Sequence, residues 1–291
     1  MVIEGIESHY FLFGLTMIWI IFAVVQDIKK REVADWLNFS LVTFALAYRA
    51  FYAAYSSELM FFVYGVLGFV LFFLLANLLY YSHVFAGGDA KLLMGLGVVL
   101  PYSSFSDLAY LGLGFVLLLF LAGAVYSAIY SIFIVRKNYD KFASAFKKNL
   151  GSRRNLVFAL AFAALFVGLI YYLSGDFLLS ALGVLFAVFA FFLVVCAKSL
   201  EVCMIKLVSP GRLTEGDWLV ADVKLSRGVI KKTVHGLSAE DIVKLRGIGK
   251  KVLIREGIPF TPAFLIAFLI MVFSLAVLRF DLNSFGLHFL S

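Results

Sequence analysis

Long apolar runs separated by short polar connections form most of this chain. Eight of these runs are candidate membrane spans. They cover residues 9–26, 38–55, 59–82, 90–104, 107–135, 155–173, 177–199 and 261–280. About 20 predominantly apolar residues are enough for a helix to cross a bilayer. The pattern therefore predicts an all-α polytopic membrane protein with about eight transmembrane helices.

The composition agrees with this fold class. Hydrophobic residues make up 63% of the chain and charged residues 15%, and the mean hydropathy is +1.01. Soluble domains have about 45–50% apolar and about 25% charged residues. A membrane environment is therefore expected, with the lipid bilayer as a partner.

The basic residues predict the orientation of the spans. With eight spans, the connections lie alternately on the two sides of the membrane. All of the 25 Lys and Arg residues except Arg49 and Arg279 then fall on the same side. Because Lys and Arg accumulate on the cytoplasmic side, the basic segments 27–37, 136–154 and 200–260 are expected there. Both termini are then outside, and the protein is expected in the cell membrane.

Residues 200–260 are the one sizeable polar stretch. They hold short strand-like runs at 218–220 and 252–254, and a helix start at Ser238 with Glu240 and Asp241 in its first turn. We expect a small cytoplasmic α+β insert. The predicted organisation is a transmembrane core at 1–199, the insert at 200–260, and a last transmembrane helix with an outer tail at 261–291.

Several function classes are disfavoured. The net charge of +7 follows the membrane topology, and we find no basic helix interleaved with base-stacking aromatics, so nucleic acid is not an expected partner. Two cysteines are too few for a structural zinc site, which usually takes four ligands. The four histidines are scattered over both sides, which disfavours a zinc site or a histidine-based triad. No cofactor and no metal are expected.

Two acidic stretches stand out at the predicted cytoplasmic boundary. Gly87 and Gly88 precede Asp89 at the start of the fourth run, and Asp27 follows the first run. An acid at the edge of a membrane helix is a functional-site candidate, although either acid alone could be a helix-terminal charge. The topology places Asp27 and Asp89 at the same depth, so helix packing could bring them together.

Two close carboxylates share chemistry that neither has alone. Because both do not ionise easily, one pKa rises and the pair shares a proton. Such a pair can deprotonate a water, deliver it to a peptide carbonyl and protonate the departing amine. Asp35, at the start of the second span, is the main rival to Asp27, but it could also cap that helix.

These residues carry a family resemblance. The segment from Asp27 through Asp35, and the run Gly88-Asp89-Ala90-Lys91-Leu92, resemble the two aspartate motifs of the type IV prepilin peptidases, the class III signal peptidases that include archaeal preflagellin peptidases. The resemblance is strongest over residues 10–135. Ala86 stands where the family has the first glycine of its Gly-x-Gly-Asp motif, and Ala34 where proline is common.

The resemblance implies roles for these residues. Asp27 and Asp89 would be the catalytic pair, with either able to act as base. Gly87 and Gly88 would permit close approach of a substrate strand or of the first span. Lys91 could hold the electrostatics of the pair or anchor its helix at the membrane interface.

By the same resemblance, the expected activity is an aspartic endopeptidase. It would remove the short leader of prepilin-like or preflagellin-like substrates at the cytoplasmic face. Bacterial members that also N-methylate carry four cysteines in a zinc-binding domain, so cleavage without methyl transfer is expected here.

Two alternatives remain open. A presenilin-like protease, which cuts within transmembrane helices, shares the glycine-aspartate motif, and residues 262–264 resemble its proline-alanine-leucine element. A transporter or proton channel would place ionisable groups near mid-bilayer. The predicted spans hold almost none apart from Arg49, so this alternative is disfavoured.

Overall fold

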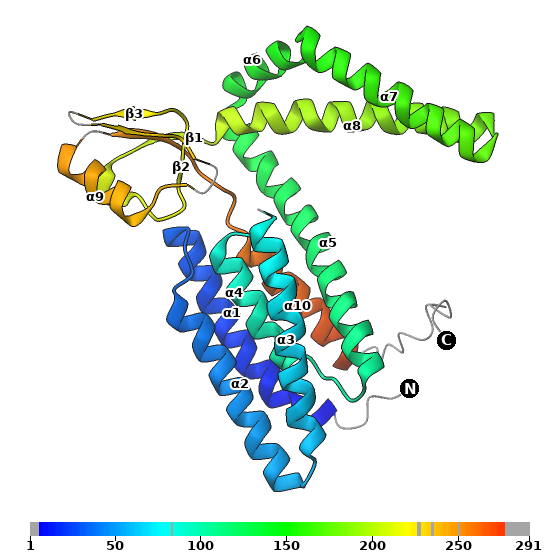
Figure 1. The fold of residues 1–291 in the computed structure, drawn as a ribbon, viewed down its shortest axis with the longest axis vertical. Coiled ribbons are helices and arrows are strands. Elements are labelled where there is room, and N and C mark those ends of the chain that lie inside the picture. The colour runs from blue at the N-terminus through cyan, green and yellow to red at the C-terminus, as the bar shows by residue number, and fades with distance from the viewer. Residues whose placement is uncertain (1–5, 83, 226–227, 234–235, 250, 277–291) are drawn as a thin grey trace. The chain divides into compact units, whose positions relative to one another are not determined.

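The computed structural model describes residues 6–82, 84–225, 228–233, 236–249 and 251–276. The chain divides into two compact units (Figure 1). The first unit comprises residues 1–128 and 258–291, and the second unit comprises residues 129–257. A segment from the end of the chain therefore folds with the N-terminal half.

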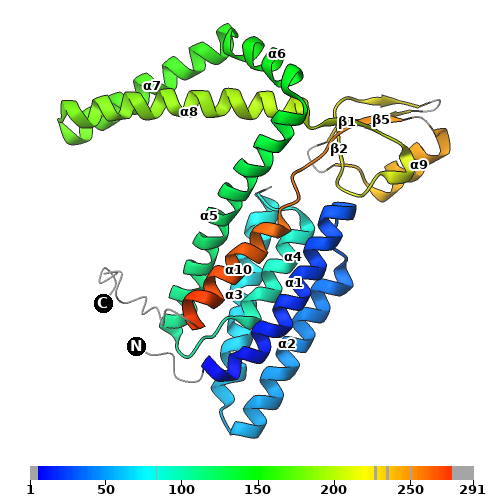
Figure 2. The ribbon, with the colours of Figure 1, turned by 180° about the vertical axis from the view of Figure 1, so that it is seen from behind.

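The first unit is a bundle of helices. Its elements are η1 (Ile6–His9), α1 (Tyr10–Lys30), α2 (Asp35–Ser56), α3 (Leu59–Tyr81), α4 (Gly87–Val99), the first part of α5 (Phe105–Lys137), and α10 (Thr261–Ala276). The helix α4 packs against α1, α2 and α3, and α10 packs along α1 (Figure 2). Eight of the 13 residues of α4 are buried, which makes α4 the centre of the bundle.

Glycines allow α3 and α4 to approach closely. A Cβ atom added at Gly68 would lie 2.2 Å from the backbone oxygen of Gly97, and one added at Gly97 would lie 2.5 Å from the backbone oxygen of Gly68. Small residues let helix backbones meet in membrane proteins. The two glycines therefore set the spacing of these helices.

Arg49 of α2 is fully buried at the opposite end of the bundle from the α4 N-terminus. Its guanidinium donates hydrogen bonds to the carbonyl oxygens of Phe61, Val98 and Leu100, each at 2.7 Å. Carbonyls near the C-terminus of a helix lack intrahelical partners. The charge that stood out in the predicted second span thus ties the end of α4 to α2 and α3.

The second unit combines helices with a small β-rich part. Its elements are the rest of α5, α6 (Tyr139–Leu150), α7 (Arg153–Ser174), α8 (Phe177–Cys203), β1 (Ile205–Val208), η2 (Pro210–Arg212), β2 (Trp218–Leu219), β3 (Val223–Lys224), β4 (Val229–Ile230), α9 (Ala239–Ile248) and β5 (Val252–Arg255). The central strand β5 pairs antiparallel with β1 and β2, and β3 pairs with β4. The expected strands and helix of the polar insert are therefore present.

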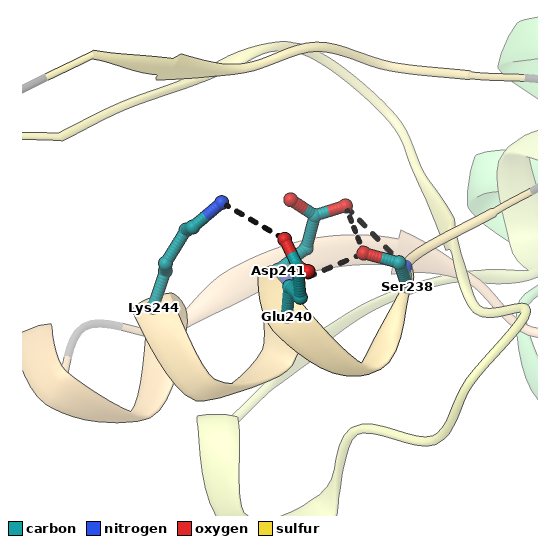
Figure 3. Close-up of polar contacts among 4 residues, drawn as sticks. All are labelled: Ser238, Glu240, Asp241 and Lys244. Carbon is teal, nitrogen blue, oxygen red and sulfur yellow. Dashed lines mark hydrogen bonds and ion pairs between the residues drawn. The ribbon is translucent and has the colours of Figure 1, made fainter.

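The helix α9 begins as its sequence predicts. The Ser238 hydroxyl accepts a hydrogen bond from the backbone N–H of Asp241, whose carboxylate accepts one from the backbone N–H of Ser238 (Figure 3). This reciprocal capping box satisfies two donors at the helix start. An ion pair between Glu240 and Lys244 follows on the next turn.

The membrane spans are confirmed only in part. Each run predicted to span contains a helix, although residues 100–104 are not helical and residues 277–280 lie outside the described residues. In the part of the chain that the structure describes, four helices are long and apolar enough to cross a bilayer: α1, α3, α5 and residues 178–203 of α8. The count of eight spans is not confirmed. At about 1.5 Å per residue, the 13 residues of α4 are too few to cross a bilayer alone.

One predicted connection contains a helix. Residues 139–150, within the basic segment 136–154, form α6, which packs against α8. Phe142 and Phe146 lie four residues apart, so they fall on one face, and their rings stack. The compact unit that contains the polar insert also includes α6, α7 and α8. The domain division drawn from the sequence stays a prediction.

Candidate functional site

Asp27 lies in the last turn of α1 and is only 8% exposed. Its backbone oxygen accepts a hydrogen bond from the N–H of Arg31, whose left-handed backbone (φ 60°) ends the helix. Its side-chain oxygen Oδ2 accepts two more, from the backbone N–H of Thr261 at 3.1 Å and from the Thr261 hydroxyl at 2.9 Å. The carboxylate therefore joins α1 to the start of α10.

Asp89 is the third residue of α4 and is partly buried. Ala86 precedes the helix with an extended backbone, and its own side chain offers no cap. The Asp89 carboxylate instead interacts with the Ala86 backbone, as the acidic member of a capping box does. Negative charge at a helix N-terminus is also favoured by the helix dipole.

The two carboxylates interact electrostatically. Burial, and after it the negative charge of Asp27, raises the pKa of the Asp89 carboxyl from 3.8 to about 7, while the hydrogen bond with the Ala86 backbone opposes the rise. A neighbouring carboxylate raises the pKa of an acid because the second negative charge is disfavoured. The bundle thus brings together the two acids that the sequence placed at equal depth.

Asp35 and Lys91 form an ion pair. Asp35 is the first residue of α2, where it makes no capping hydrogen bond, and its side chain is 62% exposed. The Lys91 ammonium, two residues after Asp89, binds the Asp35 carboxylate. Asp35 is therefore joined to α4 through a cation, in contrast to the buried position of Asp27.

Gly87 and Gly88 begin α4 without left-handed backbone angles. A Cβ atom added at Gly88 would lie 3.4 Å from the Cβ of Val33, and one added at Gly87 would lie 3.7 Å from a ring carbon of Tyr80. Both distances are van der Waals contacts. The start of α4 therefore lies against the connection from α1 to α2, with room for about one more carbon atom at Gly88.

A hydrogen bond and a buried side chain fix the conformation of the connection from α1 to α2. The side-chain oxygen of Gln26 accepts a hydrogen bond from the backbone N–H of Ala34 at 2.9 Å. Val33 is buried in the core of the bundle. This short segment therefore has a fixed path past Gly88, and it positions Asp27 and Asp35 on either side.

Thr261 is the residue that the sequence analysis missed. It is fully buried and lies 234 positions from its partner Asp27. A threonine followed by Pro262 marks a helix start, but nothing in the local pattern indicates which side chain it contacts. Only the neighbouring residues 262–264 stand out in the sequence, for their resemblance to a proline-alanine-leucine element.

Metal and thiol chemistry has little support among the described residues. They include no group of three or more His, Cys, Asp or Glu side chains that could hold a metal ion. Cys196 and Cys203 are free thiols in α8. His9 lies beside Arg49 and the Phe61 ring, and the other three histidines lie outside the described residues.

Comparisons with known proteins agree with the resemblance. Residues 14–132 match the sequence profile of the type IV leader peptidase family. The chain is 33% identical over 84 residues to a preflagellin peptidase of Methanocaldococcus jannaschii, covering 29% of this chain and 36% of the relative. It is 25% identical over 134 residues to one of Methanococcus voltae, covering 43% and 57%.

These matches are partial. The chain spans 36% of the length of the Methanocaldococcus jannaschii relative and 57% of that of Methanococcus voltae. The profile match includes Asp27 and Asp89 but ends well before α10. No solved structure matches the chain.

Proposed function

Because residues 14–132 belong to the type IV leader peptidase family, we propose that the protein is a membrane aspartic endopeptidase. It removes the short N-terminal leader of prepilin-like or preflagellin-like precursors at the cytoplasmic membrane face. One observation carries the proposal: the charge of Asp27 acts on the carboxyl of Asp89. Both acids lie within the family match, on the two helices α1 and α4.

The raised pKa of the Asp89 carboxyl fits general acid–base catalysis. With a pKa of about 7, Asp89 retains a proton at neutral pH far more than an ordinary aspartate. Asp89, which retains its proton near neutral pH, would act as the acid, and Asp27 would act as the base.

The reaction then proceeds as follows. Asp27 takes a proton from a water whose oxygen attacks the peptide carbonyl carbon. Asp89 gives its proton to the leaving amine nitrogen as the C–N bond breaks. The leader leaves with a new carboxyl group, and the mature protein keeps its apolar helix and a new amino terminus.

The activity is tested with two single variants. Asp27→Asn and Asp89→Asn each keep the size of the side chain but cannot exchange the proton, and we expect each to lower cleavage by about 10³-fold or more. The assay incubates the purified protein in liposomes with a precursor that has a short basic leader before an apolar helix. Asp140→Asn, which alters an exposed acid on α6, is the matched control and should cleave like the wild type.

Retention of more than a tenth of the wild-type rate by either variant would show that the pair is not the catalytic centre. The same product also tests the absence of methyl transfer. We propose an unmethylated amino terminus because the chain has two cysteines instead of the four of the bifunctional members. The mass of the product decides this point.

A presenilin-like activity is the second candidate. The run Pro262-Ala263-Phe264 follows Thr261 directly, and Thr261 contacts Asp27. The two activities differ in the bond that is cut. Sequencing the amino terminus of the product separates cleavage at the leader boundary from cleavage inside the apolar helix.

A further inference from the structure

We propose that Thr261 is a positioning residue that fixes the orientation of the Asp27 carboxylate for peptide hydrolysis. The inference rests on the proposed function and extends the site beyond the region that matches the family. Thr261 is the first residue of α10, whereas the family match ends at residue 132.

The two donors of Thr261 converge on one oxygen. Its backbone N–H and its hydroxyl both reach Oδ2 of Asp27, at 3.1 Å and 2.9 Å. Two bonds from one fixed residue restrict rotation of the carboxylate. Within the described residues no donor to Oδ1 is found, so Oδ1 is the oxygen free to face a water.

Packing on two sides holds Thr261 in place. The ring of Phe260 lies against Gly123 of α5, where an added Cβ would come within 2.5 Å of it. The rings of Phe260 and Phe264 lie 5.5 Å and 5.9 Å from that of Phe85, just before the Asp89 motif. The start of α10 is thus fitted between α5 and the segment that leads into α4, which preorganises the hydroxyl.

A contact that only held α1 against α10 would not need a carboxylate at position 27. Removing a carboxylate from water costs several kcal/mol unless other groups compensate, and a neutral side chain could join α1 to α10 with less penalty. The helix α10 brings no charged residue to the site. From α2 and α4 come Asp35, Asp89 and Lys91, and the ammonium of Lys91 binds Asp35. Among the residues that the structure describes, no cation forms an ion pair with Asp27, so the hydrogen bonds from Thr261 stabilise its carboxylate instead.

The test compares three substitutions at one position. Thr261→Val keeps the shape and the backbone N–H but removes the hydroxyl. We expect kcat to fall about 10- to 100-fold, the size of effect that misplacement of a reacting group produces, with KM within about twofold of the wild-type value. Thr261→Ser should restore kcat to within about threefold. Thr16→Val is the matched control, because Thr16 is also a fully buried threonine of the bundle and lies away from the site.

The Ser and Ala variants keep the test decisive if Thr261→Val does not fold, since they differ only in the hydroxyl. An unchanged kcat in Thr261→Val, or equal kcat values for Thr261→Ser and Thr261→Ala, would overturn the positioning role. So would a change in KM alone.

Failure of the proposed function is distinguishable from failure of this contact. If the wild-type protein cleaves no precursor, the proposed function fails and the catalytic part of the inference fails with it. The contact itself is measured without activity, by a double-mutant cycle on thermal unfolding in detergent. We expect non-additive effects of Thr261→Val and Asp27→Asn, and additive effects would show that the contact is absent.

Discussion

At the scale of single residues, Asp89 is a candidate functional residue whose ionised form is electrostatically disfavoured. Its pKa is raised from 3.8 to about 7, first by burial and then by the charge of Asp27. Groups with perturbed pKa values cluster at functional sites. A side chain retained there for catalysis is expected to lower stability whenever it must ionise.

The first prediction concerns Asp89→Asn and pH. The folded protein binds the Asp89 proton more tightly than the unfolded chain, so its contribution to stability is present below about pH 4 and is lost as pH rises toward 7. Asparagine does not titrate. We expect Asp89→Asn to exceed the wild type in Tm at pH 8, with the excess shrinking toward pH 4, when thermal unfolding is followed in detergent.

Asp140→Asn is the control for the removal of one negative charge. A deficit of stability in Asp89→Asn that is equal at pH 4 and pH 8 would contradict the assignment. If the variant is more stable and also inactive, the acid is kept for function.

The two acids could be found from the sequence, but their partners could not. Asp27 and Asp89 have local signals, because each lies where an apolar run meets a polar connection. The sequence left two interpretations of Asp35 open and did not indicate its ion pair with Lys91. The partner of Asp27, Thr261, lies 234 positions away. A hydrogen bond across that separation depends on how helices pack, which no local pattern contains.

At the scale of elements, apolar runs predicted where helices form more reliably than which helices cross a membrane. Each of the eight runs contains a helix in its described part, because a helix satisfies the backbone groups of a continuous apolar segment internally. The sequence missed α6, since its lysines made the segment look like a connection. Its apolar positions, such as Phe142 and Phe146, lie on one helical face.

The second prediction concerns the contact between α3 and α4. Gly68→Ala would place a methyl group 2.2 Å from the backbone oxygen of Gly97, where only movement of a helix could relieve the clash. We expect a loss of about 1–3 kcal/mol in the free energy of unfolding. Gly114→Ala in α5 is the control, because nothing lies within 4 Å of its added Cβ, and it should be neutral or stabilising by up to about 1 kcal/mol.

Equal stability of the two alanine variants in a denaturation series would show that α3 and α4 are not in close contact. Because α4 carries Asp89 at its start, we also expect Gly68→Ala to lower cleavage. Gly114→Ala should leave cleavage unchanged.

At the scale of the whole molecule, every candidate site residue lies in the first unit. Asp27, Asp35, Asp89 and Lys91 come from its N-terminal part, and Thr261 comes from the returning C-terminal segment. The family match covers the former but not the latter. The second unit interrupts the chain between them, so removal of residues after 257 should remove part of the site.

The third prediction is that α2 crosses the membrane, and the direction of the crossing determines the side on which the site lies. The helix is not among the four long apolar candidates, and it carries the buried Arg49. That charge does not prevent a span, because three carbonyl oxygens of the bundle satisfy its guanidinium. Basic residues at 29–31 precede the helix and the acid Glu58 follows it, which favours an inside-to-outside crossing.

The prediction is tested with single cysteines in a background where Cys196 and Cys203 are replaced by alanine. Glu32→Cys and Glu58→Cys flank α2 at exposed positions. A membrane-impermeant thiol reagent should label Glu58→Cys in intact cells and Glu32→Cys only after permeabilisation. Labelling of both from one side would mean that α2 does not cross. Labelling of Glu32→Cys alone in intact cells would reverse the orientation and place Asp27 and Asp89 at the outer face, away from a precursor whose leader is still in the cytoplasm.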